Sequence, residues 1–256
     1  MTAQRDGSAA LGVDPERTTS TWRGLAGGIG VQLGRLVLIV SASLVLPVLG
    51  VRGWDVGLVV NALCCIYAVV LVTGCRLWRA SGIARVRVAP IAVLALIPLV
   101  VEAVSWLLPA GLVDAPPGAA WWALSMLLVG VNEELISRVV VLSVLRRAFT
   151  AVPAVLIGAV LFGLQHLSQL LTGATSDPGE MIWLIVTATC FGFAYGAYQA
   201  RFGWVLPLIV LHALSDWLSV LSPGRPGDVV TVVVLAVLIA TGVLLLAPRF
   251  APHALR

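Results

Sequence analysis

Long apolar stretches alternate with short polar breaks along almost the whole chain. We predict eight apolar helices, because a helix rising 1.5 Å per residue needs about 20 residues to cross roughly 30 Å of hydrocarbon. The breaks contain glycine and proline, which end helices, as in VRGWD, DAPPG, SDPG and SPGRPGD. The expected spans are residues 29–50, 55–78, 89–110, 119–147, 152–172, 181–200, 204–221 and 228–247.

The composition places these helices in a lipid bilayer. Of the 256 residues, 60% are hydrophobic and 11% are charged, which is more apolar surface than one soluble core can hide. Only helices pair all their backbone groups within one segment in lipid, so we expect an all-α, polytopic membrane helix bundle. All 16 basic residues are arginines, and the net charge of +4 gives no reason to expect nucleic-acid binding. We expect a multi-pass protein of a bacterial plasma membrane.

The arginines predict the orientation of the bundle, because short cytoplasmic loops are enriched in positive charge. We expect residues 1–28 to be a flexible cytoplasmic tail, residues 29–247 to be the bundle, and residues 248–256 to be a short cytoplasmic tail. With both ends inside, the opposite side receives only Arg52 and Arg225. The cytoplasmic side then receives twelve arginines: Arg5, Arg17, Arg23, Arg76, Arg79, Arg85, Arg87, Arg146, Arg147, Arg201, Arg249 and Arg256.

A small set of ionisable residues remains deep inside the predicted spans. A charge at the centre of a bilayer costs at least about 2.5 kcal/mol, so each of these residues needs a partner, a proton or a function. The set comprises Glu102, Glu133, Glu134, Arg138, His166, His212 and Asp216. No motif explains Glu102.

The segment NEELISR, residues 132–138, concentrates three of these charges on one predicted helix. Residues four apart lie close together on a helix surface, whereas neighbours point in different directions. We therefore expect Glu134 and Arg138 to pair, leaving Glu133 available for chemistry. The alternative is one buried ion network that only holds the helix in place.

Two further motifs carry the deep histidines. FGLQH places Phe162 and His166 one turn apart, with Gly158 and Gly163 allowing close helix packing. HALSD places His212 and Asp216 one turn apart on a later helix. Counted along their spans, these residues and Glu133 reach similar depths and are expected to meet near the middle of the membrane.

Together the three motifs resemble a known family. EELISR resembles EExxxR, FGLQH resembles FxxxH, and HALSD resembles HxxxN/D of the CAAX-protease and bacteriocin-processing family of intramembrane proteases. This family, also called CPBP or Abi, includes the type II CAAX prenyl endopeptidases. The resemblance covers roughly residues 119–221, which we expect to form the protease core.

The resemblance implies roles for these residues. Glu133 is expected to activate a water molecule with the help of His166, while His212 and Asp216 are expected to stabilise the oxyanion. Asp216 departs from the asparagine that is common at this position, because an ionised carboxylate would repel an oxyanion. It acts there only if it is protonated; otherwise it accepts a hydrogen bond from His212 or orients it. The supporting positions are Glu134, Arg138 and Phe162.

Two mechanisms are compatible with these residues. In the one we favour, Glu133 and His166 activate water without a metal. In the other, a Zn²⁺ ion activates the water, and its ligands are Glu133, His166, His212 and Asp216. The sequence contains no HExxH motif.

The sequence thus predicts an intramembrane endopeptidase whose partners are the lipid bilayer and a membrane-associated protein or peptide substrate. We expect its polar cavity to be reached from the cytoplasmic side or laterally between helices. The alternative is a non-proteolytic scaffold, immunity factor or transporter subunit with a structural polar network.

Overall fold

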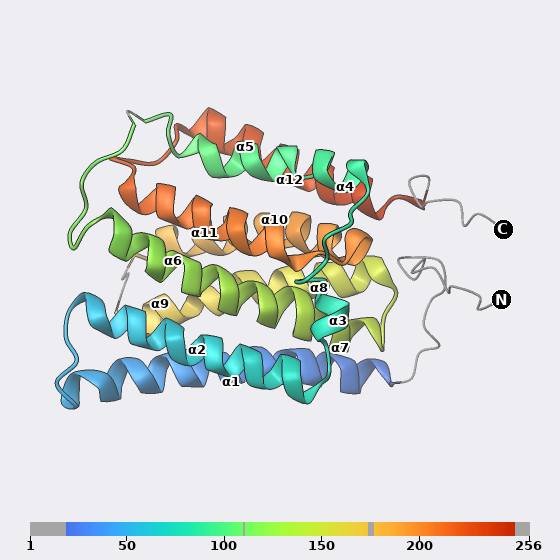
Figure 1. The fold of residues 1–256 in the computed structure, drawn as a ribbon, viewed down its shortest axis with the longest axis horizontal. Helices are drawn as coiled ribbons and strands as arrows, with labels where there is room; N and C mark the ends of the chain where they lie inside the picture. The colour runs from blue at the N-terminus through green and yellow to red at the C-terminus, as the bar shows by residue number, and fades with distance from the viewer. Residues whose placement is uncertain (1–18, 110, 174–176, 249–256) are drawn as a thin grey trace.

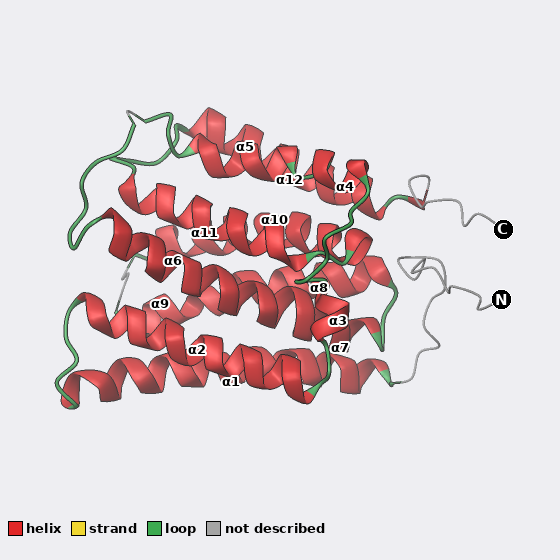
Figure 2. Ribbon diagram, in the orientation of Figure 1, coloured by secondary structure: helices red, strands yellow, loops and turns green. Residues whose placement is uncertain are grey.

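The computed structural model describes residues 19–109, 111–173 and 177–248, and every regular element within these ranges is a helix. Figure 2 shows helices joined by loops, which confirms the all-α fold class. The elements are α1 (Thr21–Val48), α2 (Trp54–Gly74), α3 (Trp78–Ser81), α4 (Pro90–Leu94), α5 (Ile97–Ser105), α6 (Ala119–Glu134), η1 (Leu135–Val141), α7 (Leu142–Arg146), α8 (Ala151–Leu164), η2 (Gln165–Leu167), α9 (Ser168–Leu171), α10 (Pro178–Phe202), α11 (Val205–Leu221) and α12 (Asp228–Leu246).

Several helices of the described chain are long and apolar enough to cross a membrane. They number five: Thr21–Val48, Trp54–Gly74, Ala151–Leu171, Pro178–Phe202 and Asp228–Leu246. Two shorter apolar helices cover Pro90–Ser105 and Val205–Leu221. The rod formed by α6, η1 and α7 carries charges in its middle, so apolar composition alone does not mark it as a span. The protein is a multi-pass membrane protein, while the count of eight spans stays a prediction.

The first predicted boundary was wrong. Helix α1 begins at Thr21 rather than at residue 29, because the Ser20 side chain accepts a hydrogen bond from the Arg23 backbone N–H and caps a polar first turn. The apolar run that we used to place the boundary starts later than the helix. Of the two predicted tails, residues 1–18 and 249–256 lie outside the described residues.

The predicted third span is also wrong in detail. Instead of one helix over residues 89–110, the chain forms α4 and α5, and the second ends at Ser105. Pro98 lies at the start of α5, where its missing N–H disturbs no helical hydrogen bond, but it could not continue α4 without losing one. The remaining predicted spans coincide with helical segments to within a few residues.

The helices that carry the three motifs lie side by side inside the bundle. Helix α6 packs against α2 and α11, while α10 packs against α8 and α12. Figure 1 shows α1 and α2 along one side, α5 and α12 along the other, and α6 and α11 between them. The start of α1 and the end of α12 lie at the same end of the bundle.

Glycines set the closest helix contacts around the motifs. A Cβ atom on Gly130 of α6 would lie 2.7 Å from the backbone oxygen of Ile209 on α11, so only glycine fits there. Gly163 of α8 similarly meets the Ile185 backbone oxygen and the Thr189 hydroxyl on α10. At Gly158 an added Cβ would make only an ordinary contact at 3.8 Å, so the expected close packing is confirmed for Gly163 alone.

The largest buried apolar cluster of the described residues lies around η1. All seven residues of η1 are buried, and the cluster extends into α2, α7 and the adjoining parts of α8, α10 and α11. We refer to this cluster as the η1 core. Its buried members are Ala68, Val72, Leu77, Leu135, Ile136, Val139, Val140, Val141, Leu142, Leu145, Ala154, Val155, Ala197, Val205 and Ile209.

Candidate active site

The predicted pair within EELISR is present. Arg138 Nε lies 3.0 Å from Glu134 Oε2, and Arg138 Nη2 donates a hydrogen bond of 3.2 Å to Glu134 Oε1. The Arg138 guanidinium also lies 4.2 Å from the centre of the Phe162 ring. Glu134 is fully buried, so this ion pair and cation–π contact replace the water that both charges have lost. Phe162 thereby links the motif on α8 to the motif on α6.

The backbone between these charges is a π-helix, which sequence reasoning did not predict. The segment η1 begins directly after Glu134 and contains Arg138. A π-turn widens a helix locally and is frequent at functional sites. In η1, Ser137 accepts a hydrogen bond of 3.3 Å from Gln32 of α1, which ties the widened turn to the first helix.

Glu133 points away from Arg138, as predicted, but it is held by partners that the sequence analysis missed. Arg35 Nη2 of α1 donates a hydrogen bond of 2.7 Å to Glu133 Oε1. Gln165 Nε2, in the turn after α8, donates one of 2.9 Å to Glu133 Oε2. Arg35 Nε also donates to Asn132 Oδ1 at 3.0 Å. One buried arginine therefore holds two adjacent side chains of α6.

His212 lies between the two glutamates. Its Nδ1 donates a hydrogen bond of 2.8 Å to Glu134 Oε1, since an ionised carboxylate can only accept. Its Nε2 lies 3.4 Å from Asp216 Oδ2 and 3.9 Å from Glu133 Oε2. Glu134 thus fixes the orientation of the imidazole and directs Nε2 towards Glu133 and Asp216. Asp216 therefore lies within reach of His212, and its role as an acceptor or orienting group stays a prediction.

His166 is oriented by the backbone of its own helix. Its Nδ1 lies 3.1 Å from the Phe162 carbonyl oxygen and 3.3 Å from that of Gly163, and because carbonyls only accept, Nδ1 must donate. This tautomer leaves Nε2 as a hydrogen-bond acceptor. The ring also packs edge-on against Phe162, with centroids 5.5 Å apart.

Two cavities meet at these side chains. The smaller one, of about 370 Å³, is lined by Arg35, Glu133, His166, His212 and Asp216, together with Gln165 and parts of α6, α9 and α11. The larger one, of about 410 Å³, shares His166, His212 and Asp216 and continues between α5, α10 and α12. The four predicted catalytic residues therefore line one space. Phe162 lines the larger cavity, whereas Glu134 and Arg138 line neither.

Glu102 belongs to the larger cavity. Its Oε1 accepts a hydrogen bond of 2.8 Å from Ser215, which lies beside Asp216 on α11. The sequence left this residue unassigned. The structure places it beside the site without a direct contact to Glu133 or His166.

Sequence reasoning missed Arg35, Gln165 and Asn132 as parts of the site. Arg35 could have been identified from the sequence, because an arginine within an apolar span needs a partner as much as a glutamate does. Gln165 directly precedes His166, and Asn132 directly precedes Glu133, so both lie next to predicted residues. Their neutral side chains gave no electrostatic reason to single them out.

The side chains are not arranged as a zinc site. Within the described ranges, no group of three or more His, Cys, Asp and Glu side chains is placed so that it could hold a metal ion. Arg35 already neutralises Glu133 at 2.7 Å, and a divalent cation bound there would lie next to a guanidinium. The zinc ligand set of Glu133, His166, His212 and Asp216 therefore does not fit this geometry.

A membrane helix bundle with buried carboxylates and imidazoles around a cavity has the elements of an intramembrane hydrolase. Residues 115–218 match the family model described as type II CAAX prenyl endopeptidase Rce1-like. The match runs from the loop before α6 into α11, contains all three motifs and confirms the resemblance over this segment. Arg35 and Glu102 lie outside it. No curated protein and no solved structure matches the chain.

Proposed function

We propose that the protein is an intramembrane endopeptidase that hydrolyses a peptide bond of a membrane-associated protein or peptide. The observation that carries the proposal is the cavity of about 370 Å³ in which Glu133, His166, His212 and Asp216 face one space. The match of residues 115–218 to an endopeptidase family supports the reaction type. The proposal concerns the peptide bond and does not require a prenyl group on the substrate.

Glu133 is the group that activates water in this scheme. A carboxylate offers about four lone-pair sites, of which Arg35 and Gln165 use two, so Glu133 can still accept a proton from water. His166 Nε2 accepts a second hydrogen bond from the same water and orients it. The water oxygen attacks the carbonyl carbon while its proton passes to Glu133. When the C–N bond breaks, Glu133 returns this proton to the leaving amine.

The negative charge on the tetrahedral intermediate needs donors fixed in advance. His212 donates through Nε2 in its doubly protonated imidazolium form, while its Nδ1–H donates to Glu134 and keeps the ring in position. Asp216 Oδ2 lies 3.4 Å from the same Nε2 and orients the ring in the resting site; the oxyanion replaces it as the acceptor when the intermediate forms. Arg35 adds a positive charge next to Glu133 that the motif residues do not provide.

The test is peptide hydrolysis by the purified protein in lipid nanodiscs, using a quenched fluorescent peptide library. Wild type is expected to cleave a subset of peptides, and Glu133→Ala is expected to show background cleavage only. The matched control is Asp114→Ala, which removes an exposed carboxylate in the loop before α6. Equal cleavage by wild type and Glu133→Ala would refute the proposal and favour a structural role for the polar network.

A further inference from the structure

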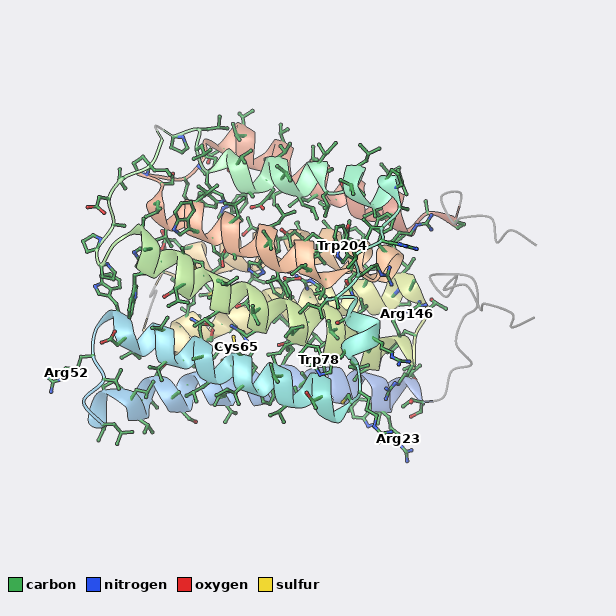
Figure 3. The ribbon with its side chains drawn as sticks, in the orientation of Figure 1. Arg23, Arg52, Cys65, Trp78, Arg146 and Trp204 are labelled. Carbon is green, nitrogen blue, oxygen red and sulfur yellow. The ribbon has the colours of Figure 1, made fainter. Side chains whose placement is uncertain are left out.

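The two ends of the bundle differ sharply in charge. The described arginines at the end where α1 starts are Arg23, Arg76, Arg79, Arg85, Arg87, Arg146, Arg147 and Arg201. The opposite end carries Arg52, between α1 and α2, and Arg225, between α11 and α12. Figure 3 shows Arg23 and Arg146 at the first end and Arg52 at the other. We refer to the first as the basic end; short loops rich in arginine face the cytoplasm.

The route from the site to the basic end is blocked by the η1 core. Beyond Glu134 the chain enters η1, whose residues are all buried, and then α7, which reaches the basic end. Buried Ala154 of α8, Ala197 of α10 and Val205 of α11 pack around it from the same end. Closely packed apolar interiors contain few voids larger than a water molecule. Neither cavity is lined by a residue of η1 or α7.

Both cavities instead extend from the site towards the opposite end. The larger one is lined by Trp106 at the end of α5, Glu180 in the first turn of α10, and Arg225 in the loop before α12. Glu180 and Arg225 form a 3.4 Å ion pair with side chains 51% and 62% exposed, so the cavity reaches the surface there. Its volume of about 410 Å³ falls within the range of ligand-binding clefts.

We propose that the site opens to the extracytoplasmic side of the membrane, and that its substrate is a peptide segment presented at that face. That the bound peptide is a substrate rests on the function proposed above. The side of the membrane to which the site opens does not depend on that function. This replaces the expectation of access from the cytoplasm or laterally between helices. It also removes a cytoplasmic protein C-terminus from the candidate substrates.

The first test determines which end faces outwards. Spheroplasts producing the full chain are treated with a membrane-impermeant maleimide. Cys75, an exposed residue at the basic end, should react only after the membrane is permeabilised. In a Cys75→Ser parent, Arg225→Cys should react in sealed spheroplasts. The reverse pattern would overturn the proposed orientation.

The second test determines from which side water reaches the cavity. In the Cys75→Ser parent, Thr187→Cys places a thiol on α10 in the lining of the larger cavity. This variant should react from outside, above the level set by Cys65 and Cys190 in the parent. Ala154→Cys, fully buried in the η1 core, is the matched control and should stay unreacted. Reaction of Thr187→Cys only after permeabilisation, or no reaction at all, would overturn the proposal.

These outcomes are independent of catalysis. Adding Glu133→Ala to the Thr187→Cys variant should leave the labelling unchanged even though it abolishes hydrolysis. A protein that labels from outside but cleaves no peptide would refute the proposed function alone. Cleavage of a membrane-impermeant quenched peptide by sealed spheroplasts of wild type, and not of Glu133→Ala, would establish both.

Discussion

The ion pair between Arg35 and Glu133 provides the sharpest test of the site. Arg35 is 4% exposed, and replacing it with glutamine removes a guanidinium that contacts Glu133 Oε1 at 2.7 Å and Asn132 Oδ1 at 3.0 Å. Hydrogen bonds to charged groups contribute about 1.5–3 kcal/mol each, and breaking a buried ion pair costs about 3–5 kcal/mol. The folded protein should therefore be measurably less stable.

The effect on catalysis is expected to be separate from the loss of stability. We expect the loss of a fixed charge next to Glu133 to lower kcat by about 10²–10³, the range for removal of one preorganised donor, which corresponds to about 2.7–4 kcal/mol. Because Arg35 contacts Glu133 and is expected to act on the reacting groups only through it, we expect KM to change little. Steady-state hydrolysis of the best library peptide in nanodiscs gives both constants, and thermal unfolding in the same nanodiscs gives the stability.

Two variants make the result interpretable. Arg35→Lys keeps the positive charge but loses the two-pronged contact, so it should recover part of kcat. Arg52→Gln removes an exposed arginine from the turn after α1 and should change neither constant. A folded Arg35→Gln protein whose kcat stays within about threefold of wild type would refute a catalytic contribution of Arg35.

Three further predictions follow from the geometry. Asp216→Asn should keep kcat within about tenfold of wild type, because an amide oxygen can still accept from His212 Nε2; loss of activity together with bound metal would instead favour ligation. Activity should survive 1,10-phenanthroline and EDTA, with metal content measured on the same sample; inhibition that Zn²⁺ reverses would contradict the metal-free scheme. Gly130→Ala should force α6 away from α11, lower stability by about 1–3 kcal/mol and reduce kcat. Gly57→Ala, where an added Cβ meets nothing within 4 Å, is its control and should be neutral or stabilising; equal behaviour of the two glycine variants would contradict the packing argument.

The contacts that were predictable from the sequence are those fixed by a single helix. Glu134 and Arg138 pair because residues four apart meet on any helix, even across the start of a π-helix. The same spacing brings His212 to Asp216. Depth counted along each span predicted that three separate helices contribute to one site, and the motif resemblance supported this.

Contacts between distant helices were not predictable, because they depend on which faces pack together. Nothing in the local sequence of Arg35 points to Glu133, which follows it by 98 residues. The π-turn after Glu134 depends likewise on tertiary packing. The break before α5 is different, because Pro98 imposes it locally and the apolar pattern that we used to place the span does not register it. The direction in which the cavities extend was not predictable either, because it depends on how the other helices pack around η1.

Because Arg35 lies on α1, the candidate site depends on a residue far outside the segment that carries the three motifs. A fragment limited to residues 115–218 would contain every motif and yet lack the guanidinium that neutralises Glu133. During synthesis α1 emerges well before α6, so Arg35 cannot pair with Glu133 until α6 takes its place in the bundle. The ion pair between Arg35 and Glu133 can form only after that step, and under the proposed function hydrolysis requires it.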